Sequence, residues 1–281
     1  MSIDNFIPSV WSAQLIRANE KALVYGNVAN RNYEGDISAF GDQVRINEIG
    51  AVTVGTYVKN STVITPETLD DAQRILEINQ SKYFAFEIDS IDKAQQKPKV
   101  MNDAMSEAGY ALRDAADQYI ASLHGEAGIT ASLGTTATPI EINSANVIDY
   151  ISLVGQKMNE NNVPTIDRYM VCPPWFFNKL NLAKITLQNP NENFLVEGHM
   201  GRVLGINLFM SNNVVNTTST KYKIIGGVGN SISFAAQILD MQAYKPESAF
   251  SDAVKGLYVF GAKVVRPDNT VCLTCNIAAE A

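Results

Sequence analysis

The stretch that decides the fold of this chain is GLYVFGAKVVRP, residues 256–267. It is a largely apolar run with a second glycine, Gly261, inside it and a proline, Pro267, at its end. A short apolar run bounded by turn residues is typical of a buried β-strand, and a proline stops such a strand. The stretch offers no residue pattern for chemistry, so it indicates a structural role.

The composition allows a large core but little exposed charge. The chain has 281 residues, of which 46% are hydrophobic, enough for one large domain or two closely packed ones. Charged residues make up 18%, below the average of about 25% for soluble domains. The formal net charge of −7 argues against a general nucleic-acid binder, which needs a basic surface. We infer that neighbouring subunits cover part of the surface.

The first half of the chain predicts an arm, a β-ribbon and a long helix. Residues 9–25 have apolar side chains at helical spacing and predict an amphipathic helix ahead of the rest of the fold. From Tyr33 to Asp89 the pattern is that of β-strands, with a polar stretch at 59–71, which predicts an extended two-stranded arm with a mobile tip. Pro98 opens the strongest helix. Its apolar stripe comprises Met101, Met105, Ala108, Leu112, Ala115, Tyr119 and Leu123.

The second half predicts an α/β segment. Ser144 is placed to cap a helix. The apolar face of this helix consists of Val147, Ile151, Val154 and Met158. Residues 166–172 predict a strand, and Pro173-Pro174 opens a short aromatic helix. Further strands are predicted at 206–211 and 222–225, whereas the run 232–244 fits helix or strand by periodicity.

Two motifs have a chemical and a structural interpretation, and the structural one is favoured in both. The C-x-x-C of Cys272 and Cys275 lies in a strand-like context and lacks the second ligand pair of a zinc site, which indicates buried strand cysteines. The glycines of residues 226–230 lack the remaining residues of a dinucleotide or P-loop motif, which favours a turn.

The remaining polar candidates also favour structural roles. Glu87, Asp89 and Asp92 could bind a divalent ion, but solvated acids at a strand end are more common. His124 lies at the carboxyl end of the long helix, where a cation complements the dipole, and His199 lies in a predicted turn. The aromatic run 175–177 suits a packed helix better than base stacking. We therefore expect no catalytic residue, no metal site and no cofactor.

Taken together and in order, several stretches resemble the major capsid proteins of tailed phages of the Hong Kong 97 type. These are residues 6–13 with 23–31, 41–47, 83–95, 201–214 and the carboxy-terminal block that contains 256–267. The resemblance covers nearly the whole chain. It implies an α+β fold, the Hong Kong 97-type capsid fold. Its expected parts are an N-terminal arm (1–32), a β extension loop (33–82), a peripheral domain (83–139 plus 251–281) with a spine helix (98–124), and an axial domain (140–250).

The resemblance also implies a function. A protein of this family is a major capsid (coat) protein and not an enzyme. It self-assembles as pentamers and hexamers into an icosahedral shell that encloses double-stranded phage DNA without sequence-specific binding. The implied partners are other copies of the chain, a portal protein and a separate scaffolding protein, since the sequence starts almost directly at the arm; no membrane is involved. The implied location is the virion capsid, assembled in the bacterial host cytoplasm.

The residues expected at subunit interfaces lie on the arm and the extension loop. They are Phe6, Trp11, Leu15, Tyr57, Val58 and Ile64. An isolated two-stranded ribbon is marginal in water, so it needs a neighbour to lie on, and head-to-tail contacts of this kind close into rings or continue as lattices. Three alternatives stay open: an encapsulin-like nanocompartment shell around cargo enzymes, a glycan-binding virion protein, and an enzyme with an unrecognised site.

Overall fold

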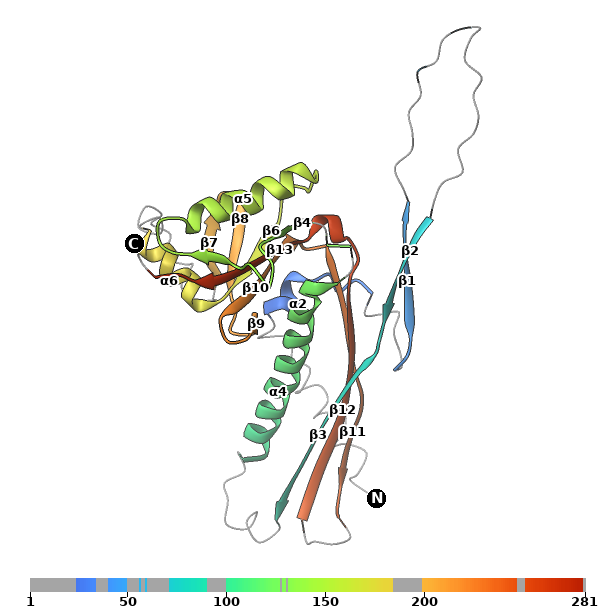
Figure 1. Ribbon diagram of the computed structural model, residues 1–281. Helices are drawn as coiled ribbons and strands as arrows, with labels where there is room; N and C mark the ends of the chain where they lie inside the picture. The colour runs from blue at the N-terminus through green and yellow to red at the C-terminus, as the bar shows by residue number, and fades with distance from the viewer. Residues whose placement is uncertain are drawn as a thin grey trace.

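The protein combines two sheets, a long helix and a projecting ribbon (Figure 1). The computed structural model describes residues 24–33, 40–49, 56, 59, 71–89, 100–126, 128–129, 131–183, 199–246 and 251–279. An eight-stranded sheet with two helices lies at one end of the molecule, and a long helix runs away from it beside a three-stranded sheet. The two-stranded ribbon forms a separate sheet beside the three-stranded one. The fold is α+β, as the sequence predicts.

The three-stranded sheet is built around the stretch quoted first. Its order is β11 (Ile232–Tyr244), β12 (Ser251–Val264) and β3 (Gln80–Asp89), with both pairings antiparallel. Most of 256–267 lies in β12, the central strand, so the predicted buried strand is confirmed. The ambiguous run 232–244 is the strand β11, because it pairs with β12 along nearly its whole length.

The spine helix α4 (Val100–Ser122) continues into a short 3-10 turn, η3 (Leu123–Gly125). Its predicted stripe is correct at Met105 and Leu112, but further along the helix the buried positions are Ala116 and Ile120 instead of Ala115 and Tyr119. The helix packs on more than one side, which a single stripe does not describe. The Tyr119 ring lies edge-on to Phe260 of β12, with ring centroids 5.6 Å apart. Another side of α4 faces the short helix α2 (Val24–Val28).

The eight-stranded sheet has the order β4-β13-β10-β6-β8-β7, with β5 added on β13 and β9 on β10. The strands are β4 (Ala131–Leu133), β5 (Ile140–Ile142), β6 (Arg168–Cys172), β7 (His199–Val203), β8 (Ile206–Met210), β9 (Val215–Thr217), β10 (Lys221–Val228) and β13 (Val271–Ile277). Two helices pack with it, α5 (Val147–Glu160) and α6 (Pro174–Leu182). The four predicted apolar residues of α5 are all buried, and α6 begins at the predicted proline pair.

Three local predictions in this region are wrong in detail. Ser144 does not cap α5, because Asn146 occupies the N-cap position. The strand predicted from residue 166 begins at Arg168, because Asp167 has a φ of 57° and interrupts the extended backbone. Of the turn predicted over 226–230, Gly229 and Asn230 do form a turn, whereas Gly226 and Gly227 lie inside β10. A Cβ on Gly227 would come within 2.7 Å of the Ser231 hydroxyl, so close packing accounts for the glycine there.

Sheet membership crosses the expected domain limits near the end of the chain. β11, inside 140–250, pairs with β12, whereas β13, inside 251–281, pairs with β10 of the other sheet. Most of the buried apolar residues of both sheets and of α4 form one continuous cluster. The four domain ranges themselves stay a prediction.

The projecting ribbon consists of β1 (Gln43–Ile49) and β2 (Asp71–Glu77), paired antiparallel from Gln43↔Glu77 to Ile49↔Asp71. This confirms the two-stranded part of the predicted arm. Leu76 and Ile78 at its base form a separate buried cluster with Val259 of β12 and Ala235 of β11. The base of the ribbon is therefore fixed to one face of the three-stranded sheet.

Candidate assembly surfaces

The first candidate surface is the ribbon itself. β1 and β2 form a sheet of their own that no other described strand extends, and Figure 1 shows that it projects from its base on the three-stranded sheet. Apolar Ile75 and, near the base, Phe40 are exposed. Because a two-stranded sheet is marginally stable by itself in water, these surfaces favour contact with another molecule.

The second candidate surface is the open face of the three-stranded sheet. Helix α4 covers the opposite face, toward which Phe84 and Phe260 point from β3 and β12. On the open face, Tyr83 lies directly opposite Leu257 in the strand register. Their side chains are 79% and 36% exposed. On this same face the base of the ribbon covers Val259. The uncovered part of the face, around Tyr83 and Leu257, therefore lies directly beside the ribbon base.

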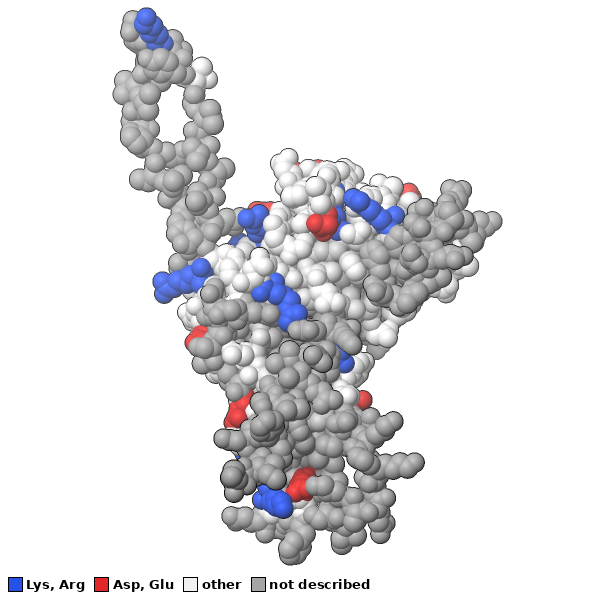
Figure 2. All heavy atoms as spheres, turned by 180° about the vertical axis from the view of Figure 1, so that it is seen from behind, with Lys and Arg blue, Asp and Glu red and all other residues white. Residues whose placement is uncertain are grey.

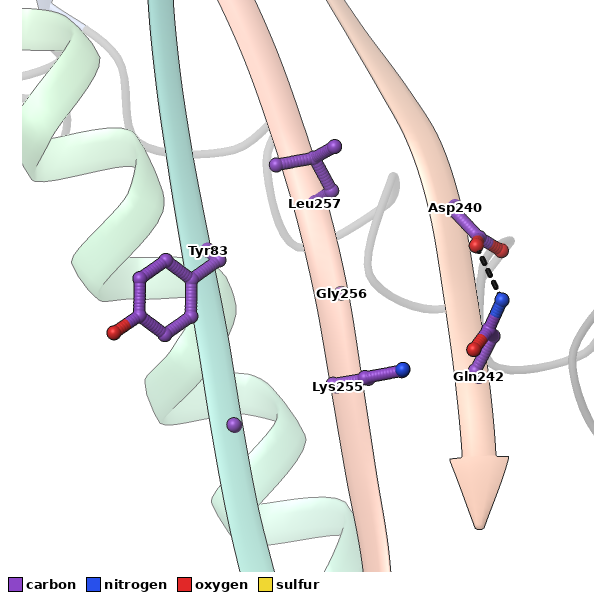
Figure 3. Close-up of a pocket in the computed structure, with 7 residues that line it drawn as sticks. Tyr83, Asp240, Gln242, Lys255, Gly256 and Leu257 are labelled. Carbon is purple, nitrogen blue, oxygen red and sulfur yellow. Dashed lines mark hydrogen bonds between the residues drawn. The ribbon is translucent and has the colours of Figure 1, made fainter.

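A shallow groove of about 390 Å³ follows this open face. Figure 3 shows that its side chains come from all three strands. The lining residues are Tyr83, Ala85, Asp240, Gln242, Lys255, Gly256 and Leu257.

The polar side chains at the rim of the groove interact with one another or with a neighbouring aromatic ring. The Gln242 amide donates to the Asp240 carboxylate over 2.5 Å, and the Lys255 ammonium lies 5.2 Å from the centre of the Tyr244 ring. An apolar centre with a polar rim is the usual composition of a protein–protein interface.

A third exposed apolar region lies at the end of the eight-stranded sheet. Ile166 and Leu204 are both exposed, Ile166 before β6 and Leu204 in the β7–β8 turn. Arg202 of β7 donates to the Thr165 carbonyl over 3.5 Å, which places the two loops side by side. Exposed apolar residues on adjacent loops form a contact surface that is separate from the groove.

The three cysteines are buried and free, and they do not form a reactive site. Cys272 and Cys275 lie in β13, so the expected buried strand cysteines are confirmed. Burial raises the pKa of all three thiols, that of Cys172 well above its ordinary value and that of Cys275 to about 12. Nucleophilic thiol chemistry requires the thiolate, which these pKa values disfavour at neutral pH.

These thiols give a direct test of the core. In the native protein we expect labelling of the three cysteines to be at least about a hundredfold slower than in the denatured chain, because a reagent needs both exposure and the thiolate. The rate should stay low up to about pH 8.5, since the pKa of each thiol is raised. Mass spectrometry after alkylation, with and without denaturant, measures both. Rapid native labelling of Cys272 or Cys275 would contradict the buried strand.

The histidines and acidic residues occupy structural positions. Burial lowers the pKa of His124, so it is neutral near pH 7 and not the expected cation at the helix end; its Nδ1 lies 3.2 Å from the Ala121 carbonyl. His199 begins β7 instead of lying in a turn. Asp89 ends β3, which confirms the strand-end interpretation, and Glu87 accepts a hydrogen bond from Ser251. Asp92 lies outside the described residues.

Further findings concern metals, membranes and the aromatic helix. In the part of the chain that the structure describes, no cluster of three His, Cys, Asp or Glu side chains could hold a metal ion. None of the described helices has the length and apolar character to cross a membrane. Phe176 and Phe177 are buried, and the Trp175 ring packs edge-on against Tyr222, which confirms the packed helix.

The interface residues expected from the sequence lie outside the described residues. They are Phe6, Trp11, Leu15, Tyr57, Val58 and Ile64, and the helix predicted over 9–25 lies outside them too, except for its last two residues. Their interface role stays a prediction. The sequence analysis did not single out Tyr83 or Leu257 as interface residues, because only the strand register brings them together.

Comparison with known proteins identifies the fold. No protein-family model and no curated protein matches the sequence. A solved structure from Mycobacterium phage Che8 is 25% identical, with a TM-score of 0.73, over 90% of this chain and 91% of that one. The capsid of Cyanophage P-SCSP1u is 18% identical, with a TM-score of 0.70, over 92% and 89%. A virus-like particle from Pyrococcus furiosus is 11% identical, with a TM-score of 0.59, over 95% and 98%.

These similarities define the fold class of the protein. The chain has the fold of the tailed-phage major capsid proteins, the Hong Kong 97-type capsid fold that the sequence resemblance implies.

Proposed function

We propose that this chain is the major capsid protein of a tailed phage or prophage, a structural subunit of the virion. In this proposal it assembles with copies of itself as pentamers and hexamers into an icosahedral shell around double-stranded DNA. The observation that carries the proposal is the match to phage capsid folds over about nine tenths of the chain. The projecting ribbon and the open sheet face support it, because both are surfaces that a lone subunit leaves uncovered.

The proposed contact between subunits is head-to-tail. The ribbon of one subunit lies on the open sheet face of the next, beside the place where that subunit's own ribbon base covers Val259. A contact between two different surfaces of the same chain repeats around a ring instead of ending with a dimer. Many modest contacts repeated around a closed shell give a stable particle even where each is weak.

The charge distribution supports enclosure of DNA without specific binding. The formal net charge is −7, and on the face seen in Figure 2 the described basic side chains are scattered instead of forming one basic field. Confinement does not require attraction, whereas sequence reading needs base contacts from a basic surface. A portal protein and a separate scaffolding protein complete the proposed partners, with assembly in the host cytoplasm.

A second candidate is the shell of a compartment that encloses proteins instead of DNA, as in the encapsulin-like alternative. The similarity to the virus-like particle from Pyrococcus furiosus, over 95% of this chain, supports a shell-forming role without deciding what the shell encloses. The content of purified particles distinguishes the two: nuclease-protected DNA favours the phage capsid, and a defined cargo protein favours the compartment. We expect no enzymatic turnover in either case.

The ribbon provides the experiment that tests shell formation. Replacing residues 56–70 by a short Gly-Ser turn leaves β1 and β2 intact, so we expect a folded subunit with an unchanged circular dichroism spectrum but no closed shells. Light scattering and electron microscopy measure the second part. A matched control replaces the exposed turn residues Thr218 and Ser219 by glycine. Glycine fits both positions because their φ angles are 57° and 61°, values that glycine adopts readily. Normal shells from the ribbon variant would refute the proposed contact.

A further inference from the structure

A buried lysine lies on one face of the eight-stranded sheet. Lys223 of β10 is only 6% exposed. Its ammonium donates a hydrogen bond of 2.6 Å to the hydroxyl of Thr136, in the connection between β4 and β5. It donates a second one of 3.1 Å to the hydroxyl of Thr274 in β13. An ammonium has three donors, and the described residues accept hydrogen bonds from two of them.

The charge of this ammonium is not compensated by a carboxylate of the described residues. None of their aspartates or glutamates forms an ion pair with Lys223. The one acid within the strands β4, β5, β9, β10 and β13 is Glu141 of β5, and it is exposed. Buried charges are normally paired, because removing a charge from water is costly. At a purely structural position an apolar side chain would be no less stable, so the lysine indicates a negatively charged ligand.

Further donors lie on the same side of the sheet. Side chains alternate along a strand, so Lys221 shares the face of Lys223, roughly 7 Å away along the backbone. Tyr222 between them belongs to the opposite face, where its ring packs against Trp175 of α6. Lys221 is half-buried and likewise forms no ion pair with a described residue. Thr136 is exposed, and because its oxygen accepts from Lys223, its own hydroxyl hydrogen is available to a ligand.

We propose that Lys223, Lys221 and Thr136 form a binding site for a phosphate group, either of free phosphate or of a nucleic-acid backbone. A phosphate group has several acceptor oxygens, so it can accept from the third donor of Lys223, from the Thr136 hydroxyl and from the Lys221 ammonium together. Thr274 is 4% exposed and holds the Lys223 ammonium in place from within the sheet. The bound anion supplies the negative charge that the described surroundings of Lys223 lack.

His124 provides a reporter for this site. It lies in η3, which contacts β10. Burial is the main cause of its lowered pKa, and the charge of Lys223 lowers the pKa further, so the ring is within electrostatic reach of the ammonium. An anion bound to Lys223 offsets that charge and changes the environment of the ring. The other histidine of the chain, His199, begins β7 at the far edge of the same sheet.

Proton NMR of the full-length, unassembled subunit tests the site. Inorganic phosphate replaces chloride stepwise at constant ionic strength and neutral pH, and the C2–H signals of the two histidines are followed, with His124→Gln for assignment. We expect the His124 signal to move to a plateau and the His199 signal to stay in place. An equal response to acetate would overturn the assignment to phosphate.

A DNA duplex of mixed sequence distinguishes the two sources of the phosphate group. A His124 shift at a lower concentration of phosphate groups with the duplex than with inorganic phosphate identifies a nucleic-acid backbone as the ligand. A shift with inorganic phosphate alone identifies the free ion. Both results support the site, because its chemistry is the same in the two cases.

Three variants locate the site within the sheet. Lys223→Met removes the charge and keeps a side chain of similar length, and we expect phosphate affinity to fall at least about tenfold. Thr136→Val removes one exposed hydroxyl donor and should lower the affinity about threefold to fivefold. The matched control is Lys157→Met in α5, which removes an exposed lysine that pairs with Glu160 over 2.6 Å and should leave the phosphate affinity unchanged.

The contrary results are equally defined. If neither inorganic phosphate nor DNA moves the His124 signal to a plateau, the site does not exist. Native affinity in both Lys223→Met and Thr136→Val would overturn it as well. If Lys223→Met does not fold, the titration of the native subunit and of Thr136→Val still decides, because Thr136 is exposed. The site does not depend on the proposed function, since the subunit is titrated before any assembly.

Discussion

Replacing Gly261 with alanine is expected to lower the free energy of unfolding by about 3 kcal/mol or more. An added Cβ at this position would overlap the carbonyl oxygen of Glu77 and would lie 3.0 Å from Cα of Ile78. Both atoms belong to the backbone at the ribbon base, so the clash is relieved only if β2 moves away from β12. Chemical denaturation followed by circular dichroism measures the loss.

Two other glycines serve as controls for this prediction. A Cβ on Gly256, in the same strand, would meet the ring of Phe84, a side chain that can rotate, so we expect a smaller loss of about 1 kcal/mol. A Cβ on Gly125 would meet nothing within 4 Å, and we expect a change of less than about 0.5 kcal/mol there. If Gly261→Ala were as stable as Gly125→Ala, the close contact between β12 and the ribbon base would be wrong.

Tyr83→Glu is expected to abolish closed shells while leaving the subunit folded. The Tyr83 side chain is largely exposed in the single subunit, so its replacement should change the free energy of unfolding by less than about 0.5 kcal/mol. In the assembled shell the same position lies, in our proposal, beneath a neighbouring subunit. A carboxylate buried there without a partner is strongly unfavourable. Sedimentation velocity measures assembly, and the melting temperature of the unassembled subunit measures folding.

The matched control is Tyr83→Phe, which keeps the ring and removes only the hydroxyl, and which should still form shells. Leu257→Glu, directly opposite in the register, should behave like Tyr83→Glu. Normal shells from both glutamate variants would remove the groove from the account of assembly. A large drop in the melting temperature of the unassembled variants would do the same, because a folding defect would then explain the loss of shells.

The success of the sequence predictions depended on how many sides of an element are packed. α5 buries one face, and a single helical stripe predicted all four of its buried residues. α4 packs on more than one side, so one stripe described only part of it, and Asp117 among its buried residues gave no apolar signal. The strand β11 was ambiguous because its identity depends on pairing with β12, which periodicity does not contain.

The candidate surfaces were less predictable than the fold. The two-stranded ribbon follows from its polar–apolar pattern, which is a local property of the chain. The groove depends on Tyr83 and Leu257 lying opposite each other, and this register is fixed by the long-range pairing of β3 with β12. An exposed tyrosine in a strand has no sequence signal that separates it from a buried one.

The most direct test of the central claim is electron microscopy of the purified full-length protein, expressed alone and together with the genes that flank its own. We predict closed, hollow particles in at least one of the two preparations, and a dependence on a flanking gene would identify the scaffold. A subunit that stays monomeric, or that stops at a small ring in both preparations, would contradict the assignment as a shell protein.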